Sequence, residues 1–372
     1  MVRGLRGVIG GVLALAMQGG CAVAPPAWTT RPLGAGQPRV LTTAGVDLLY
    51  GWSDAAGPHF ALVTESPDGQ VAAREVPLQP GTPYGRVTDW VSIVTDGTRV
   101  TAVGGAAGGA HGNTRWTVWS GTGAGLVEQP QEFEAFGGWD AGGVRGLGLL
   151  DGEPVLVGSW RGAAGLDVTT WHPVGVAWLR DDSAGTPLAA TATELPEATG
   201  VSGVPGALVV SGTVTRLQGG VRVRPAVWVG RPEGDALVWE RTDPAALDGT
   251  RAETVGCAGA GCLVVGRSAG NMVAWAWASG SALPVGLPPV DLAENDVVLP
   301  PVATPDGSWV VAVHRPQGPS PVLAGSGDAW RALPAPPVPP LAVTTHVDHV
   351  DLVGILEGAP VLVSLDPAPR GP

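Results

Sequence analysis

The chain contains no lysine, and all 21 of its basic residues are arginine. Its 33 acidic residues outnumber them, so the formal net charge is −12 at pH 7. An acidic surface repels phosphate backbones, which excludes nucleic acid as an expected partner. The sequence also holds no P-loop, no dinucleotide fingerprint and no HExxH zinc motif. We therefore expect no cofactor and no bound metal.

Long helical patterns are missing as well. After residue 20, no stretch of useful length has the apolar spacing of an amphipathic helix. The 58 glycines and 36 prolines fall at intervals between short apolar runs, where they mark turns. Short strands separated by turns predict an all-β protein.

The apolar runs recur seven times, and most end in or near glycine. They read VDLLYG (46–51), RVTAVG (99–104), PVLVG (154–158), ALVVSG (207–212), CLVVG (262–266), WVVAV (309–313) and VDLVG (350–354). One turn residue per repeat lies at 45, 97, 152, 206, 259, 307 and 348, so the steps are 41 to 55 residues long. That spacing is typical of propeller blades. The sequence predicts a seven-bladed β-propeller of four-stranded antiparallel blades, forming one domain over residues 28–369.

Tryptophan marks the third strand of four repeats. These strands are expected at RWTVW (115–119), VGVAW (174–178), PAVWV (225–229) and MVAWAW (272–277). Recurrence of Trp119, Trp178, Trp228 and Trp275 at blade spacing indicates packing between blades. In the third repeat, AATATEL (189–195) is expected to form the fourth strand.

The seventh repeat lacks a fourth strand of its own. Residues 27–33, AWTTRPL, resemble a fourth strand such as AWRALP (329–334). We expect the N-terminal strand to close the last blade, because closure removes the exposed edge of an open array.

The first residues have the pattern of a secretion signal. Arg3 and Arg6 precede a short apolar segment at 8–17, and small residues lead to Cys21. This pattern resembles the lipobox of bacterial lipoproteins, which implies a signal peptide at 1–20, lipid on Cys21 and a short tether at 21–27. The protein would then be anchored to the outer face of the cell membrane, with plain secretion as the alternative.

Two cysteines remain, Cys257 and Cys262, on either side of the turn AGAG. In an exported protein such a pair predicts a disulfide that joins the two strands of a hairpin, with metal binding as the alternative. A second candidate metal cluster, THVDHVD (345–351), occupies the place of a structural turn, so no metal site is predicted there.

One rim of the propeller is the candidate binding surface. Six residues that follow the apolar runs are predicted to bind a ligand: Trp52, Trp160, Arg161, Arg267, His314 and Arg315. Three guanidinium groups could hold a carboxylate, and the indoles could stack on a sugar. Alternatively these arginines fall there by chance, because arginine is the only strongly basic residue that the chain uses.

The bridged turn VGCAGAGCLVVG and hairpins such as TPDGSWVV resemble the sialidase-like and BNR-repeat β-propellers of exported bacterial proteins. Catalytic sialidases imply an arginine triad, which Arg161, Arg267 and Arg315 could imitate, and a tyrosine nucleophile, for which only Tyr50 and Tyr84 are present. The resemblance leaves two functions. The first is a non-catalytic surface lipoprotein that binds a protein or glycan through its loop rim, and the alternative is a carbohydrate-active hydrolase. For the first function we expect no catalytic residues.

Overall fold

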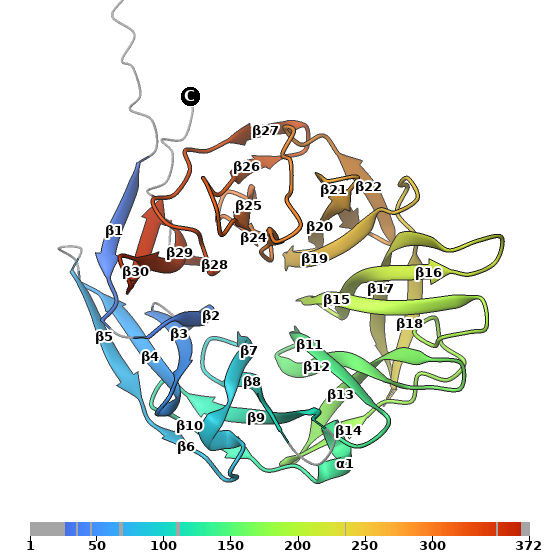
Figure 1. Ribbon diagram of the computed structural model, residues 1–372, viewed down its shortest axis with the longest axis horizontal. Coiled ribbons are helices and arrows are strands. Elements are labelled where there is room, and N and C mark those ends of the chain that lie inside the picture. The colour runs from blue at the N-terminus through green and yellow to red at the C-terminus, as the bar shows by residue number, and fades with distance from the viewer. Residues whose placement is uncertain are drawn as a thin grey trace, which may run out of the picture.

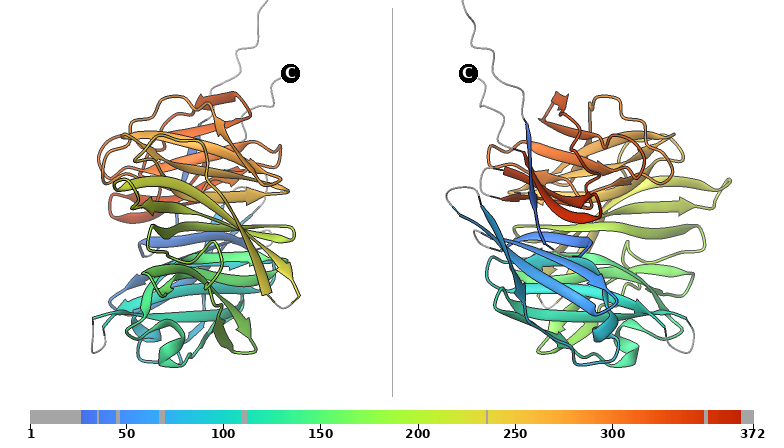
Figure 2. Two further views of the ribbon diagram at one scale, coloured as in Figure 1. Left: turned by 90° about the vertical axis from the view of Figure 1, so that its right-hand side faces the viewer. Right: turned by 60° about the vertical axis from the view of Figure 1, so that its left-hand side comes forward.

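A ring of seven sheets makes up the protein. The computed structural model describes residues 27–34, 36–44, 47–66, 70–108, 112–234, 236–346 and 349–365. Each sheet is a blade whose first strand lies nearest the centre of the ring (Figure 1). Side views show the sheets face to face as successive layers (Figure 2). The prediction of a seven-bladed propeller with four-stranded antiparallel blades is confirmed.

The first four blades occupy residues 38–242. Blade 1 contains β2 (Pro38–Ala44), β3 (Asp47–Asp54), β4 (Gly57–Glu65) and β5 (Val71–Val76). Blade 2 contains β7 (Asp89–Thr95), β8 (Val100–Ala107), β9 (Thr114–Thr122) and β10 (Gly125–Gln129), and the short β6 (Leu78–Gln79) pairs in parallel with β10. Blade 3 contains β11 (Ala141–Leu150), β12 (Glu153–Arg161), β13 (Leu166–Val174) and β14 (Ala177–Arg180). Blade 4 contains β15 (Glu194–Val204), β16 (Ala207–Arg216), β17 (Arg222–Glu233) and β18 (Ala236–Thr242).

The last three blades include one irregular sheet. Blade 5 contains β19 (Arg251–Ala258), β20 (Gly261–Ser268), β21 (Asn271–Ala278) and β22 (Ser281–Val285). In blade 6 the first strand is divided into β23 (Val297–Val298) and β24 (Val302–Ala303), which both pair with β25 (Trp309–His314), followed by β26 (Val322–Ser326) and β27 (Ala329–Ala332). Blade 7 contains β28 (Ala342–His346), β29 (His349–Leu356), β30 (Ala359–Leu365) and the N-terminal β1 (Trp28–Pro32).

The N-terminal strand closes the ring as predicted. β1 pairs antiparallel with β30, with Trp28 opposite Leu365 and Pro32 opposite Val361. The Trp28 indole also donates a hydrogen bond to the Pro334 carbonyl at 2.8 Å. Strands from both ends of the chain therefore share one sheet, which removes an open edge of the array.

The glycine that ends the apolar run in blades 2 to 5 has a structural cause. In blades 2 to 5 the first strand carries a β-bulge, and the residue just before it pairs with Gly104, Gly158, Gly212 or Gly266. A Cβ atom on Gly212 would lie 2.0 Å from the Glu197 carbonyl oxygen. Bulged strands approach their neighbours closely, and only glycine leaves room for that approach.

Buried tryptophans occupy one register position in the third strands of blades 2 to 5. They are Trp119, Trp171, Trp228 and Trp275, which pair with Ala102, Leu156, Val210 and Val264 of the second strands. All four are almost completely inaccessible and pack in clusters shared by adjacent blades. The inter-blade packing predicted for Trp119, Trp178, Trp228 and Trp275 is present for all four, because Trp178 also lies in a cluster shared by blades 2 and 3, but the third-strand position is correct for three of them.

The prediction for the outer strands of blade 3 is wrong. Residues 174–178 contain the turn between β13 and β14, with Gly175 at φ +65°, and residues 189–193 precede β15. Trp178 therefore lies on the fourth strand, and Trp171 takes its predicted place. The apolar pattern runs across the turn with no break, so it indicated one strand where the backbone reverses.

The predicted disulfide is present. Cys257 and Cys262 face each other in the hairpin of β19 and β20, and their Cα atoms lie 4.0 Å apart. The helical segments in the described part of the chain are η1 (Gly85–Val87) and α1 (Phe133–Phe136), and none of its helices is long and apolar enough to cross a membrane. The signal peptide at 1–20, the lipid on Cys21 and residues 22–26 of the tether fall outside the described residues.

Candidate functional site

The antiparallel order of the strands divides the connections between two faces of the ring. Links from second to third strands, and from each blade to the next, lie on one face, which we call the loop face. Turns between first and second strands and between third and fourth strands lie on the opposite face. The six residues predicted to bind a ligand lie at or near second-strand ends, on the loop face.

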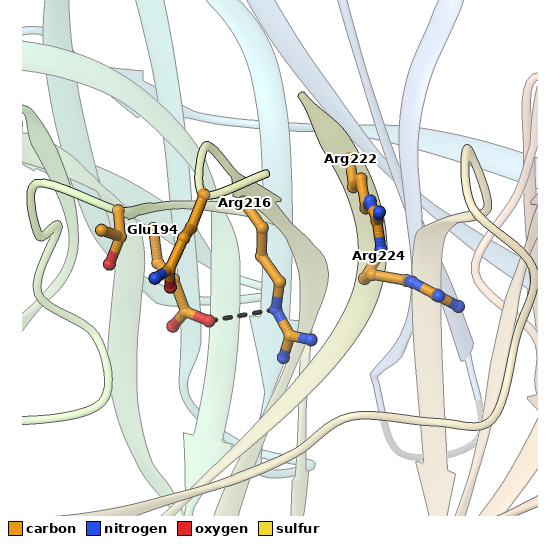
Figure 3. A pocket seen from close by; sticks show the side chains of 6 residues that line it. Glu194, Arg216, Arg222 and Arg224 are labelled. Atoms are coloured by element: carbon orange, nitrogen blue, oxygen red, sulfur yellow. Dashed lines mark hydrogen bonds and ion pairs between the residues drawn. The ribbon is translucent and has the colours of Figure 1, made fainter. Parts of the chain in front are cut away.

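An arginine-lined cavity opens on the loop face of blade 4. Its volume is about 260 Å³, and the residues that line it are all polar or charged: Thr193, Glu194, Arg216, Gln218, Arg222 and Arg224. Strand register brings these residues together, because Glu194 pairs with Arg216, and Arg216 pairs with Arg222. In Figure 3 the four labelled side chains come from adjacent strands, and a dashed line joins Arg216 to Glu194.

Glu194 and Arg216 belong to a compact ion cluster. Glu194 accepts from Arg216 at 3.0 Å and from Arg241 at 2.8 Å, and both arginines also contact Asp243. The hydrogen bond from Arg241 is the main cause that holds the pKa of Glu194 below its usual value, and the charge of Arg216 adds to it. Glu194 is thus an ionised acceptor beside the cavity.

The other two arginines face a third carboxylate. Arg224 Nε lies 2.8 Å from Asp248 Oδ1, and Arg222 Nε lies 4.0 Å from Asp248 Oδ2. The side chain of Arg222 is 55% exposed, and its ion pair is the longest in the group. Arg222 is therefore the lining arginine with the loosest internal contact.

The charge of this group is positive although the chain is acidic. Four arginines (Arg216, Arg222, Arg224 and Arg241) face three carboxylates (Glu194, Asp243 and Asp248), which leaves a local charge of 4 − 3 = +1. Guanidinium groups stay protonated and offer several N–H donors in one plane. The cavity can therefore accept a carboxylate or another oxyanion.

The two predicted tryptophans are both engaged in packing. Trp52 is buried, with its ring stacked on His59 at 4.9 Å and on Tyr50 at 5.1 Å between ring centroids. Trp160 contacts Trp171 edge to face, and the Arg180 guanidinium lies 4.9 Å from its ring centroid.

Arg267 and Arg315 meet at one connection, and Arg161 is two blades away from Arg267. Arg315 donates twice to Asp296 Oδ2, at 2.9 and 2.8 Å, and Arg267 donates to Glu253 and to the Ala293 and Asp296 carbonyls. Arg161 is largely exposed and lies 3.8 Å from Asp140.

Asp296 is the buried partner in this connection. Burial on its own would raise the pKa of Asp296, but hydrogen bonds from Arg315 and the Ala293 N–H, with the charges of both arginines, hold it below its usual value. His314 lies nearby in sequence, with Nδ1 3.0 Å from the Pro340 carbonyl oxygen. The structure therefore does not gather the six predicted residues around one cavity.

Two further motifs can be assigned to structural elements. Residues 266–270, GRSAG, match the GxSxG pattern, but they span the end of β20 and a hairpin turn, where Ser268 shares a 2.8 Å hydrogen bond with Thr250. A nucleophile elbow requires a strand-to-helix turn, so this match is fortuitous. In the cluster at 345–351, His346 Nδ1 lies 3.6 Å from Asp351 Oδ2, and Asp348 is outside the described residues. Among described residues no group of three His, Cys, Asp or Glu could hold a metal ion.

Sequence reasoning missed part of the arginine group. Arg216 ends the second strand of blade 4 and Arg222 begins the third, close to the predicted rim, whereas Arg224 and Arg241 were not predicted there. The signal was present in VRVR (221–224), because alternate residues of a strand point to the same side. Two arginines at that spacing indicate a local cationic face.

Comparison with known proteins supports the fold alone. No family model matches the chain, and no curated protein matches its sequence. Among solved structures, a prolyl endopeptidase is 17% identical with a TM-score of 0.51, over 93% of this chain and 48% of that one. A candidate 6-phosphogluconolactonase from Bacteroides uniformis is 10% identical with a TM-score of 0.50, over 88% and 98%.

A sialidase from Trypanosoma rangeli is also similar, at 11% identity and a TM-score of 0.44, over 92% of this chain and 60% of the sialidase. The chain thus spans about half to three fifths of the endopeptidase and sialidase chains that it matches. The endopeptidase and the candidate lactonase have different names, yet both resemble this fold, so the fold does not specify a function.

Proposed function

We propose that this chain is a non-catalytic binding scaffold whose loop face takes an anionic group of a protein or glycan. The single observation that carries the proposal is the arginine-lined cavity on blade 4. Rigid strands present its guanidinium groups, and the arrangement leaves Arg222 loosely paired. Because the rest of the protein is acidic, a negatively charged ligand is attracted to this positive group and repelled by the remaining surface.

The size and chemistry of the cavity favour a small anionic portion of a ligand. Its volume of about 260 Å³ lies below the usual range for drug-sized molecules. Its polar lining can serve hydroxyl groups as well as the anion, through Thr193, Gln218 and Glu194. An acidic sugar or an acidic side chain of a protein meets both requirements.

The test measures binding of the full-length chain to arrays of acidic and neutral glycans and peptides. We expect acidic ligands to be retained, and Arg222→Ala to weaken that binding by roughly tenfold or more, since a charge-assisted hydrogen bond contributes about 1.5–3 kcal/mol. Arg231→Ala is the matched control, because it removes the same charge from an exposed pair with Glu240 on the same blade. Equal binding by both variants, or no preference for acidic ligands, would reject the proposal.

The proposal includes anchoring through lipid on Cys21, with the propeller at the outer face of the membrane. Metabolic labelling with a fatty acid is expected to mark the wild type and to leave Cys21→Ala unlabelled. Release of the labelled wild type into the medium would favour plain secretion instead.

No structural observation favours the alternative function, a hydrolase. Its proposed arginines, Arg267 and Arg315, direct their donors into the connection at 291–296 and not toward a substrate site.

A further inference from the structure

The carboxylate of Asp248 forms ion pairs with two of the arginines that line the cavity. One of its oxygens faces Arg224 at 2.8 Å, and the other faces Arg222 at 4.0 Å. The two oxygens of the Asp248 carboxylate are thus divided between two guanidinium groups. The same two arginines could bind the carboxylate of a ligand in this way. In Figure 3 the Arg224 side chain extends away from Glu194. Asp248 therefore stabilises a position of Arg224 on the side away from Glu194.

The backbone that carries Asp248 is held in place independently of its side chain. The Gly249 N–H donates to the Val223 carbonyl at 3.0 Å, and the Thr250 hydroxyl bonds to Ser268 at 2.8 Å. Arg224 also donates to the Ala246 carbonyl, so its contact with the connection does not depend on Asp248 alone. The Asp248 side chain itself is 52% exposed. Rotation of this side chain into solvent would release both arginines from the Asp248 carboxylate with no change in the fold, and Arg224 would keep its hydrogen bond to the Ala246 carbonyl.

We propose that Asp248 is a built-in competitor, which a ligand carboxylate replaces on Arg222 and Arg224. This inference rests on the proposed function and adds how its site is regulated. The internal pair weakens binding by the free energy needed to break it, and it favours ligands whose carboxylate can bridge both arginines. Exposed ion pairs are weak, so the competitor lowers affinity without closing the site.

The experiment compares affinities of the full-length wild type and Asp248→Asn by calorimetric titration. The probes are D-glucuronate and tetraglutamate, which carry the same carboxylate chemistry from a sugar and from a peptide, and sulfate serves as a non-carboxylate anion. We expect Asp248→Asn to bind the preferred carboxylate probe about two- to fivefold more tightly, as loss of an exposed pair predicts. Glu240→Gln removes the same charge from an outer strand of blade 4, and we expect it to leave affinity unchanged.

A second measurement separates competition from a general charge effect. The gain from Asp248→Asn is expected to shrink in an Arg222→Met or Arg224→Met background, because Asp248 then competes for one arginine only. A gain of undiminished size in both backgrounds, or an equal gain from Glu240→Gln, overturns the inference and leaves the proposed function standing. Wild type that binds neither carboxylate probe overturns the proposed function, and the inference with it. Preference for sulfate over both carboxylates overturns the inference alone.

Discussion

Replacing Arg315 with alanine separates a structural role from a ligand-binding role on the loop face. The Arg315 guanidinium makes two hydrogen bonds to Asp296 Oδ2, and the Asp296 side chain is only 2% exposed. Its removal leaves a buried carboxylate with the Ala293 N–H as a donor and with Arg267 as the nearby cation. A structural role therefore predicts a loss of stability.

The magnitude follows from the burial of the pair. Removal of one partner of a buried salt bridge costs about 3–5 kcal/mol, because the other charge is left uncompensated. Asp296 retains one donor, and Arg315 is about one quarter exposed, so water can replace part of the interaction. We expect Arg315→Ala to lower the free energy of unfolding by about 3 kcal/mol.

Urea unfolding of Arg315→Ala, Asp296→Asn and the double variant provides the assay. The double variant is expected to recover at least about 1 kcal/mol relative to additive losses, because the amide leaves no uncompensated charge. A stability within about 0.5 kcal/mol of the wild type, together with lost ligand binding, would refute the reasoning and favour the ligand role.

The same pair makes stability depend on pH. The folded pKa of Asp296 lies below its ordinary value of 3.8, so this carboxylate stabilises the wild type above pH 3.8. That stabilisation is lost as the pH falls through the folded pKa. The difference between wild type and Arg315→Ala should therefore shrink below pH 3.8, where a protonated Asp296 no longer needs a counterion.

Three further predictions concern stability and are measured by the same unfolding assay. Glu128 is buried and accepts from the Gly81 and Thr82 N–H groups and the Thr82 hydroxyl at 2.6–2.8 Å, so Glu128→Ala should cost about 3 kcal/mol. Glu128→Gln keeps an acceptor for both N–H groups and should cost about 1 kcal/mol, and an equal loss in both variants would contradict this account. Replacing Cys257 and Cys262 together by alanine should lower the free energy of unfolding by about 2 kcal/mol. The loss is small for a disulfide because the two cysteines are only five residues apart in sequence. An unchanged urea midpoint would show that the bridge adds no stability. Gly212→Ala should cost more than about 1 kcal/mol, since its Cβ would lie 2.0 Å from a backbone oxygen, and wild-type stability would mean that the bulge can relax.

The propeller architecture could be predicted because the sequence repeats once for each blade. Each blade cannot bury its faces alone, so the apolar runs must recur at blade spacing. The recurrent glycines strengthened that pattern, although their cause is the approach of a bulged strand at positions such as Gly158 and not only the turn. Closure by β1 followed from a count of strands, and a missing strand in one repeat had a counterpart at the other end of the chain.

Blade 3 shows where periodicity fails. Trp171 and Trp178 are seven residues apart, and both are buried, but a turn at Gly175 places them on different strands. Val174 and Val176 beside that turn are exposed and apolar. Because this turn is formed by apolar residues, the sequence carries no polar turn signal there. The third strand of blade 3 was therefore predicted several residues too far toward the C-terminus.

Placement of the rim arginines near second-strand ends could be predicted, but the direction of their donors could not. Arg267 and Arg315 turn to the connection at 291–296 because its carbonyls and Asp296 need donors. That connection is far from Arg267 in sequence and has no periodicity that reports its path. Arg222 and Arg224 are different, since their spacing in one strand already implied a shared side.

Pairing on the loop face distinguishes Arg222 from Arg267 and Arg315 as a group that a ligand can bind. Arg315 meets the buried carboxylate of Asp296, and Arg267 meets Glu253 at 2.8 Å. A ligand anion would have to displace these short contacts, and for Arg315 it would also have to uncover a buried charge. Arg222 faces its carboxylate at 4.0 Å, where both groups are about half exposed and solvent screens the attraction. A ligand anion can therefore take the Arg222 guanidinium at a lower cost than that of Arg267 or Arg315, whose donors are held by short internal contacts.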